Sequence, residues 1–273
     1  MATHWDGLVS GDYEWVMPLS WKEKLGLRYA CQPAFTPQLG IFGPDAPSKA
    51  ILHEFLKASR SHFRFGEIYL NSSNVIYSAP ACDNFLLDIA RGHDSISAGY
   101  SENHKRNLKK AFAAGLVYEK TERDPDSMEP AIAFLRQQVP HLSRDDFRRL
   151  RKSCLALWQR GQCLQRIVRS QEGKMLSRTL FLHDGRRIIN LLPFTYEAGR
   201  PLGAGHFLLD RLIAEFSGQP LLLDFEGSII PSIARFYSGF GAQAEQYPFI
   251  RWNDLPLPIR WLKPAGDPVS FLP

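Results

Sequence analysis

The sequence predicts an α/β protein with two similar halves, each a mixed sheet flanked by helices. The chain has 273 residues, of which 44% are hydrophobic and 22% charged, a balance that suits a globular protein with a sizeable core. Each half runs through strands, a helix and a further strand, an order compatible with a degenerate duplication. A polar, acidic run at 121–127 separates them, so we expect domains at 1–120 and 121–273.

The first half is expected to combine short strands with two helices. Ser48 is placed to cap a helix over 49–59, whose apolar residues share one face. A basic helix follows between an N-cap at Ser101 and a stop at Gly115. The strands are expected at residues 15–19, 38–43, 67–71, 84–89 and 116–121.

The second half is expected to open with two helices and to continue with a hairpin. Ser143 and Asp146 form the pattern of a capping box at the start of the second helix. The strands are expected at residues 164–169, 176–183, 187–196 and 221–225. The helices are expected near 130–139, after Ser143, at 206–216 and at 233–241, before an irregular tail at 255–273.

Composition excludes several classes of protein. No apolar run approaches the roughly 18 residues that span a bilayer, and the N-terminus lacks the pattern of a secretory signal. Four cysteines without CxxC spacing indicate free thiols in a reducing cytoplasm. The eight histidines show no HxxxH or HExxH pairing, so no metal is expected. A net charge of +5 favours anionic ligands but falls short of a DNA-binding signature.

The segment 200–205, Arg-Pro-Leu-Gly-Ala-Gly, lies between a predicted strand and a predicted amphipathic helix. The N-terminus of a helix has unpaired N–H groups and a partial positive charge, and glycines let a ligand approach the backbone closely. A diphosphate is expected to bind there through main-chain N–H groups, assisted by Arg200. An ordinary tight strand-to-helix turn would contain the same glycines.

The next strand carries two carboxylates near its end. Alternation places Asp224 and Glu226 on one face, where they would line a cleft or instead cap a turn or pair with an arginine. Tyr237 follows on the short helix at 233–241. A tyrosine with an ordinary pKa near 10 is suited to protonate a leaving thiolate, although a packed aromatic ring is the simpler interpretation.

Two motifs in this order resemble the GNAT superfamily of N-acetyltransferases. Arg200-x-x-Gly203-x-Gly205 resembles its pyrophosphate loop, and the segment 236–242, Phe-Tyr-Ser-Gly-Phe-Gly-Ala, resembles its later FYxxxGF motif, with Ala in place of the final Phe. The resemblance implies that coenzyme A or acetyl-CoA binds at the loop, including Ala204. It also implies that Tyr237 is the general acid.

A second likeness covers more of the chain. Lys109-Lys110-Ala111-x-x-x-Gly115, the strand end at 224–227 and the segment 236–241 resemble the Fem-type aminoacyl-tRNA:peptidoglycan transferases, which are tandem proteins whose first domain lacks the loop. Tyr237 stands where the Fem-type pattern commonly has a lysine, which favours acyl-CoA over aminoacyl-tRNA. Compared with bacterial proteins of this type, the chain is expected to begin after a first strand.

The basic helix carries Lys105, Arg106, Lys109 and Lys110 around its exposed side. A solvated basic face is the simpler interpretation of this pattern. The functional interpretation is that Lys105, Arg106 and Lys109 line a cleft between the halves and contact an anionic substrate or carrier.

The sequence therefore predicts a cytoplasmic N-acyltransferase that moves an acyl group from a thioester to an amine. Acetyl is the acyl group that we expect. Glu226 would accept the amine proton, with Asp224 beside it, and Tyr237 would protonate the thiolate. Main-chain N–H groups near Leu192 and Phe194 would contact the donor and polarise its carbonyl.

Two other functions fit the same residues. One is a Fem-like transferase that uses charged tRNA and a cell-wall precursor, and the other is a non-catalytic binding module with the same fold. Nothing in the sequence distinguishes a sugar amine, a peptide amine or a polyamine as the acceptor.

Overall fold

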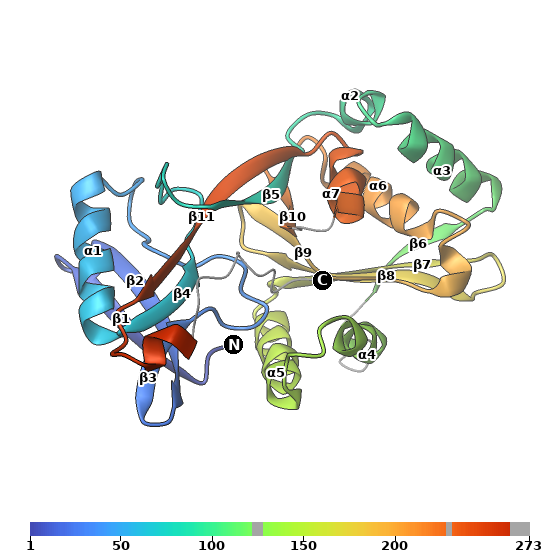
Figure 1. Ribbon diagram of the computed structural model, residues 1–273. Helices are drawn as coiled ribbons and strands as arrows, with labels where there is room; N and C mark the ends of the chain where they lie inside the picture. The colour runs from blue at the N-terminus through green and yellow to red at the C-terminus, as the bar shows by residue number, and fades with distance from the viewer. Residues whose placement is uncertain (122–127, 228–230, 263–273) are drawn as a thin grey trace. The chain divides into compact units, whose positions relative to one another are not determined.

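The computed structural model describes residues 1–121, 128–227 and 231–262 (Figure 1). The chain forms two compact units: Met1–Asp83 together with residues 245–262, and Asn84–Ala244. This division differs from the predicted split after residue 120, because residues 84–121 pack with the second unit. Most of the predicted boundary at 121–127 lies outside the described residues. That the two halves are tandem GNAT-like domains stays a prediction.

In the first unit the sheet strands lie in the order β1-β2-β3-β4-β11. Its strands are β1 (His4–Ser10), β2 (Trp15–Lys24), β3 (Leu27–Cys31), β4 (Phe65–Tyr69) and β11 (Gln243–Asn253). Among the described strands of this unit, β3 and β4 pair in parallel, and α1 (Lys49–His62) supplies the crossover that a parallel pair requires. Ser48 Oγ caps α1 by accepting the Ile51 N–H at 3.3 Å, as predicted.

The predicted strand at 38–43 is wrong. This segment makes only isolated bridges, Leu39 to Leu70 and Val16 to Phe42. Gly40 interrupts it with φ +99°, a conformation in which a strand cannot continue.

In the second unit the sheet strands lie in the order β5-β10-β9-β8-β7-β6. Its strands are β5 (Ala81–Asp88), β6 (Val117–Thr121), β7 (Cys163–Arg169), β8 (Met175–His183), β9 (Arg187–Thr195) and β10 (Leu222–Gly227). The predicted hairpin is confirmed as β7 and β8. β9 and β10 form the parallel pair, joined through α6 (Ala204–Phe216), and the other neighbours are antiparallel.

Helices cover both faces of this second sheet. Figure 1 shows α3 (Glu102–Ala113), α6 and α7 (Pro231–Ser238) on one side of β7–β9, and α4 (Glu129–Gln138) and α5 (Arg144–Gln159) on the other. The short helix α2 (His93–Ala98) precedes α3. The capping box of Ser143 and Asp146 is present at the start of α5. No helix in the described parts of the chain is long and apolar enough to cross a bilayer.

The core on the α6 side of this sheet determines where α7 lies. It joins Leu108 of α3 and Leu212 of α6 to Leu223 and Phe225 of β10 and to Tyr237 of α7. Burying apolar side chains from three helices and the sheet fixes α7 against β10, so Tyr237 is held at a defined place over that strand.

Candidate active site

The parallel pairing of β9 and β10 ends early. Its register runs from Leu222 opposite Arg187 to Asp224 opposite Ile189, whereas β9 continues to Thr195. Both strands are irregular at this level. The register of β9 against β8 shifts after Asn190, and that of β10 against β5 shifts after Asp224. The two strands therefore separate where each carries a bulge, a feature that is common next to active sites.

Asp224 is held by partners on both oxygens. Its Oδ2 accepts a hydrogen bond from Arg187 Nη1 at 2.9 Å, and its Oδ1 accepts the N–H of Glu226 at 2.9 Å. The interpretation that this carboxylate pairs with an arginine is thus confirmed. Asp224 is 7% exposed, and its charge acts on the neighbouring glutamate.

Glu226 occupies the irregular part of β10 with φ +60°, in the left-handed region. A non-glycine residue pays about 1–2 kcal/mol for this conformation, and such strain tends to occur at functional sites. Burial, and then the charge of Asp224, raises the pKa of Glu226 to about 8. At neutral pH this carboxyl group is largely protonated, and it gains its charge within the range where thiols and amines titrate.

Tyr237 is buried beneath α7 with its ring stacked on Phe225, at 4.8 Å between centroids. Burial, and then the charge of Glu226, raises the pKa of Tyr237 well above its ordinary value. The hydroxyl therefore stays neutral and is a weaker acid than the sequence led us to expect.

Asn190 was missed by the sequence analysis. Its side chain is 3% exposed, and neither amide atom has a hydrogen-bond partner among the described residues. It lies close enough to Tyr237 to lower the pKa of the tyrosine, although the two groups do not reach hydrogen-bond geometry. An unpartnered buried amide costs about 1–3 kcal/mol. A single polar residue within the apolar run 188–192 was the signal that could have identified it.

The glycines of the predicted phosphate loop allow close packing. Gly203 has φ +71° and precedes α6, and a Cβ there would lie 2.6 Å from the carbonyl oxygen of Asn107 on α3. A Cβ at Gly205 would lie 2.9 Å from Thr195 Oγ1, and Ala204 is fully buried. Arg200 is exposed. Packing accounts for these glycines without a ligand, and phosphate binding here stays a prediction.

The other predicted contacts are spread over two elements. Lys105, Arg106 and Lys109 are exposed on α3, where Lys105 pairs with Glu102 at 3.1 Å and Arg106 donates a hydrogen bond to Asn103 at 3.0 Å. On β9, Leu192 is buried, and the ring of Phe194 packs against Phe134 of α4 at 5.4 Å between centroids.

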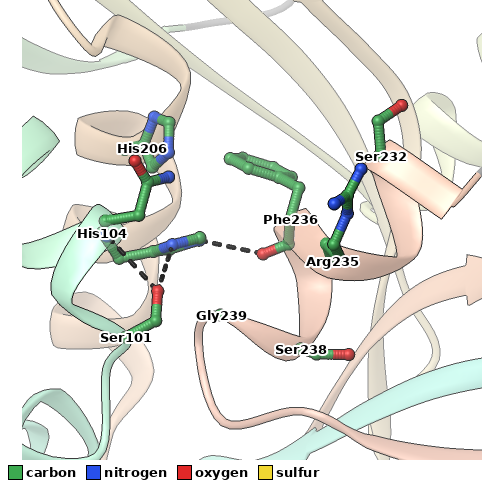
Figure 2. Close-up of a pocket in the computed structure, with 9 residues that line it drawn as sticks. Ser101, His104, His206, Ser232, Arg235, Phe236, Ser238 and Gly239 are labelled. Carbon is green, nitrogen blue, oxygen red and sulfur yellow. Dashed lines mark hydrogen bonds between the residues drawn. The ribbon is translucent and has the colours of Figure 1, made fainter.

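A pocket of about 670 Å³ lies between the start of α3, the first turn of α6 and α7 (Figure 2). It is lined by Ser101, Asn103, His104, His206, Ser232, Arg235, Phe236, Ser238 and Gly239. The predicted loop glycines and Glu226 are not among these residues. Tyr237 points to β10, but its neighbours Phe236 and Ser238 line the pocket.

Two histidines that the sequence analysis set aside define one wall of this pocket. His104 is 2% exposed, and its Nε2 donates a hydrogen bond to the carbonyl of Phe236 at 2.9 Å (Figure 2). Its Nδ1 then accepts from Ser101 Oγ at 2.9 Å, which fixes the neutral Nε2–H tautomer. Gly239 leaves room for this ring, since a Cβ there would lie 2.1 Å from His104 Cε1.

His206 packs against His104 with ring centroids 4.7 Å apart. Burial, and then the nearby His104 and Lys110, lowers the pKa of His206 to about 4, so the ring is neutral at pH 7. Its Nε2 has no hydrogen-bond partner in the described residues. No group of three His, Cys, Asp or Glu side chains within residues 1–121, 128–227 and 231–262 is arranged to hold a metal ion.

Comparisons with known proteins identify the fold. No family model and no curated protein matches the chain. Among solved structures, FemX is similar over 95% of this chain and 90% of its own, with 13% identity and a TM-score of 0.64. L-PGS from Bacillus licheniformis is similar over 94% of this chain and 87% of its own, with 11% identity and a TM-score of 0.52.

A third structure is the C-terminal domain of a putative lysylphosphatidylglycerol synthetase from Agrobacterium fabrum. It is similar over 91% of this chain and 84% of its own, with 14% identity and a TM-score of 0.51. At these identities the likeness concerns the fold alone. It confirms that the chain shares its fold with FemX, as the predicted resemblance to Fem-type proteins implied.

Proposed function

We propose that the protein is an acyltransferase that moves an acyl group from a thioester to an amine where β9 and β10 separate. The observation that carries the proposal is the coupled pair of Glu226 and Tyr237, both with raised pKa values, beside two bulged strands. Such a transfer needs a base whose pKa is near those of amines and thiols, together with a neutral hydroxyl that can donate a proton. The fold shared with FemX supports this interpretation.

The proton path follows from the two pKa values. Glu226, in its ionised form, accepts the proton of the attacking amine. Tyr237 by itself is a poor donor to a thiolate, because its pKa lies far above the thiol value of about 8.5. If Tyr237 gives its proton to the sulfur while it takes one from Glu226, the net proton donor is Glu226, whose pKa is about 8. This pKa is close to that of the thiol, so the net proton transfer has a small free-energy change. Asp224 keeps the pKa of Glu226 high.

The donor we propose is an acyl-coenzyme A. The pocket of about 670 Å³ has the size of small-molecule sites and borders the positive end of α6. Arg235 in its lining, and Arg200 on the adjoining turn, offer positive charge to phosphates. In this proposal Gly203, Ala204 and Gly205 contact the pyrophosphate through main-chain N–H groups, Leu192 and Phe194 contact the acyl end, and Lys105, Arg106 and Lys109 attract an anionic acceptor.

A second candidate is transfer of an aminoacyl group from charged tRNA to a cell-wall precursor. The likeness to FemX and to a putative lysylphosphatidylglycerol synthetase favours it. Tyr237, in place of the lysine of the Fem-type pattern, favours the thioester. A binding module without catalysis is the third candidate.

Thermal melting with candidate donors separates these functions. We expect acetyl-CoA to raise the melting temperature of the wild type, and Arg235→Ala to reduce that shift. Arg148→Ala is the matched control, because Arg148 is an exposed arginine on α5, paired at 3.1 Å with Asp145. Turnover is then measured as free thiol released with a panel of amines. A shift with aminoacyl-tRNA alone would favour the second candidate, and neither binding nor turnover would favour the third.

A further inference from the structure

Asn190 is a buried amide in an otherwise apolar stretch of β9. It is 3% exposed, and its Nδ2 and Oδ1 both lack hydrogen-bond partners in the part of the chain that the structure describes. Buried side-chain amides in folded proteins are hydrogen-bonded with few exceptions. The adjacent core side chains, Ile188 and Phe181, are apolar. The Tyr237 hydroxyl lies near this amide, and the amide keeps hydrogen-bonding capacity for a bound group.

The position of Asn190 indicates what that group is. It is the first residue of β9 beyond the last pair with β10, Ile189 opposite Asp224. Side chains alternate along a strand, so Asn190 lies on the same face of β9 as Ile188. Ile188 belongs to the core that contains Tyr237. The nearness of Asn190 and Tyr237 is independently evident, since the amide lowers the pKa of the hydroxyl. Asn190 thus points to the place where the acyl group would react.

The backbone of β9 offers fewer donors here than a regular free edge would. Pro193 has no N–H, although the sequence led us to expect main-chain N–H groups near Leu192 and Phe194 to polarise the carbonyl. Residues 192–195 also remain in register with β8, whose antiparallel ladder engages alternate residues. A side-chain hydrogen-bond donor can take the place of the main-chain N–H groups that are missing here.

We propose that Asn190 is a catalytic residue whose Nδ2 donates a hydrogen bond to the oxyanion that forms on the acyl oxygen. This role rests on the acyltransferase function proposed above. The amine nitrogen bonds to the acyl carbon, and the carbonyl π electrons move onto the oxygen that Asn190 holds. When the carbonyl re-forms, the C–S bond breaks. The sulfur leaves with the proton of Tyr237, and Tyr237 regains the proton that Glu226 took from the amine.

The test compares Asn190→Ala and Asn190→Asp with the wild type in steady-state transfer. Aspartate keeps the shape of the side chain but, when ionised, has no hydrogen to donate. Loss of one oxyanion donor is expected to lower kcat about 10²–10³-fold while KM for the acyl donor changes less than about threefold. Asn190→Ser keeps a hydrogen-bond donor at this position and is expected to retain part of the wild-type kcat. It provides the test if the other two variants fold poorly.

Asn84→Ala is the matched control. Asn84 is 1% exposed and likewise unpartnered within the described residues, but its neighbour Phe85 faces Tyr237, so Asn84 points to the other face of the sheet. We expect this variant to keep kcat. The role of Asn190 is overturned if its variants retain wild-type kcat, or if Asn84→Ala loses as much. A wild type inactive with every donor overturns the proposed function itself, and this role with it.

Discussion

The charge of Glu226 acts on the hydroxyl of Tyr237, and after burial it is the main reason why the pKa of that tyrosine is raised. Glu226 stands in a left-handed conformation where β10 becomes irregular, and Tyr237 lies over the same strand, stacked on Phe225. The titrations of the two side chains are therefore linked, and in the proposed reaction the pair acts as one proton-transfer unit.

Replacing Glu226 is expected to remove the base. The wild-type rate should rise with pH through a midpoint of about 8, because the ionised carboxylate is the active form and its folded pKa lies there. In Glu226→Gln, kcat should fall about 10²–10⁴-fold, and this rise should vanish. The measurement is a pH profile of kcat between pH 6 and 10. An unchanged profile in the variant would remove Glu226 from the mechanism.

Replacing Asp224 tests the cause of that midpoint. The charge of Asp224 raises the pKa of Glu226, so Asp224→Asn should move the midpoint of the profile to lower pH. Arg187 loses its charged partner in this variant, so some loss of stability should accompany the shift. A midpoint that stays in place would mean that burial alone sets the pKa of Glu226.

Tyr237→Phe removes the hydroxyl and keeps the ring. The stack on Phe225 should survive, so the melting temperature should stay near that of the wild type. Loss of the proton relay should lower kcat about 10²-fold or more. Transfer assays at several pH values check this, and equal turnover throughout would refute the relay.

Gly203→Ala is expected to destabilise the protein through packing. The added Cβ would lie 2.6 Å from the Asn107 carbonyl oxygen and would also strain a residue with φ +71°. Gly218→Ala is the matched control. Gly218 has φ +83°, and a Cβ added there would meet nothing within 4 Å. This variant therefore measures the cost of backbone strain without a steric clash. Urea unfolding should give the larger loss for Gly203→Ala. Equal losses in the free energy of unfolding would mean that α3 shifts to accommodate the added Cβ at no energetic cost.

Glu215→Gln tests a buried ion pair away from the site. Glu215 accepts two hydrogen bonds from Arg166, at 2.7 and 2.8 Å, and one from Tyr118 at 2.7 Å. Although burial opposes ionisation, these bonds, with Lys120, lower the pKa of Glu215 to about 2. Loss of the charge should cost roughly 3 kcal/mol at pH 7, because Arg166 stays buried without its partner.

The pH dependence of this cost has a defined sign. A carboxyl group with a lowered folded pKa stabilises the protein above its unfolded value, near 4.5, and loses that contribution as pH falls toward 2. The difference between wild type and Glu215→Gln should therefore shrink across this range in urea titrations. Asp145→Asn, which removes an exposed pair with Arg148, should cost less than about 1 kcal/mol.

Local patterns accounted for much of the fold. The caps at Ser48, Ser101 and Ser143 were predictable, because each depends on hydrogen bonds within three residues. The hairpin of β7 and β8 was predictable for the same reason. The strand expected at 38–43 failed, because Gly40 takes a conformation that propensity does not reveal.

Residue patterns alone predicted the fold resemblance, the glycine turn and the order of Glu226 and Tyr237 along the chain. The packing of the folded chain was needed to see that Gly203 makes room for α3, that His104 is bonded to the carbonyl of Phe236, and that Asn190 lacks a partner among the described residues. Caps and turns are predictable because they arise between near neighbours in sequence. Burial, pKa shifts and unsatisfied amides arise from elements far apart in the chain that the fold brings together.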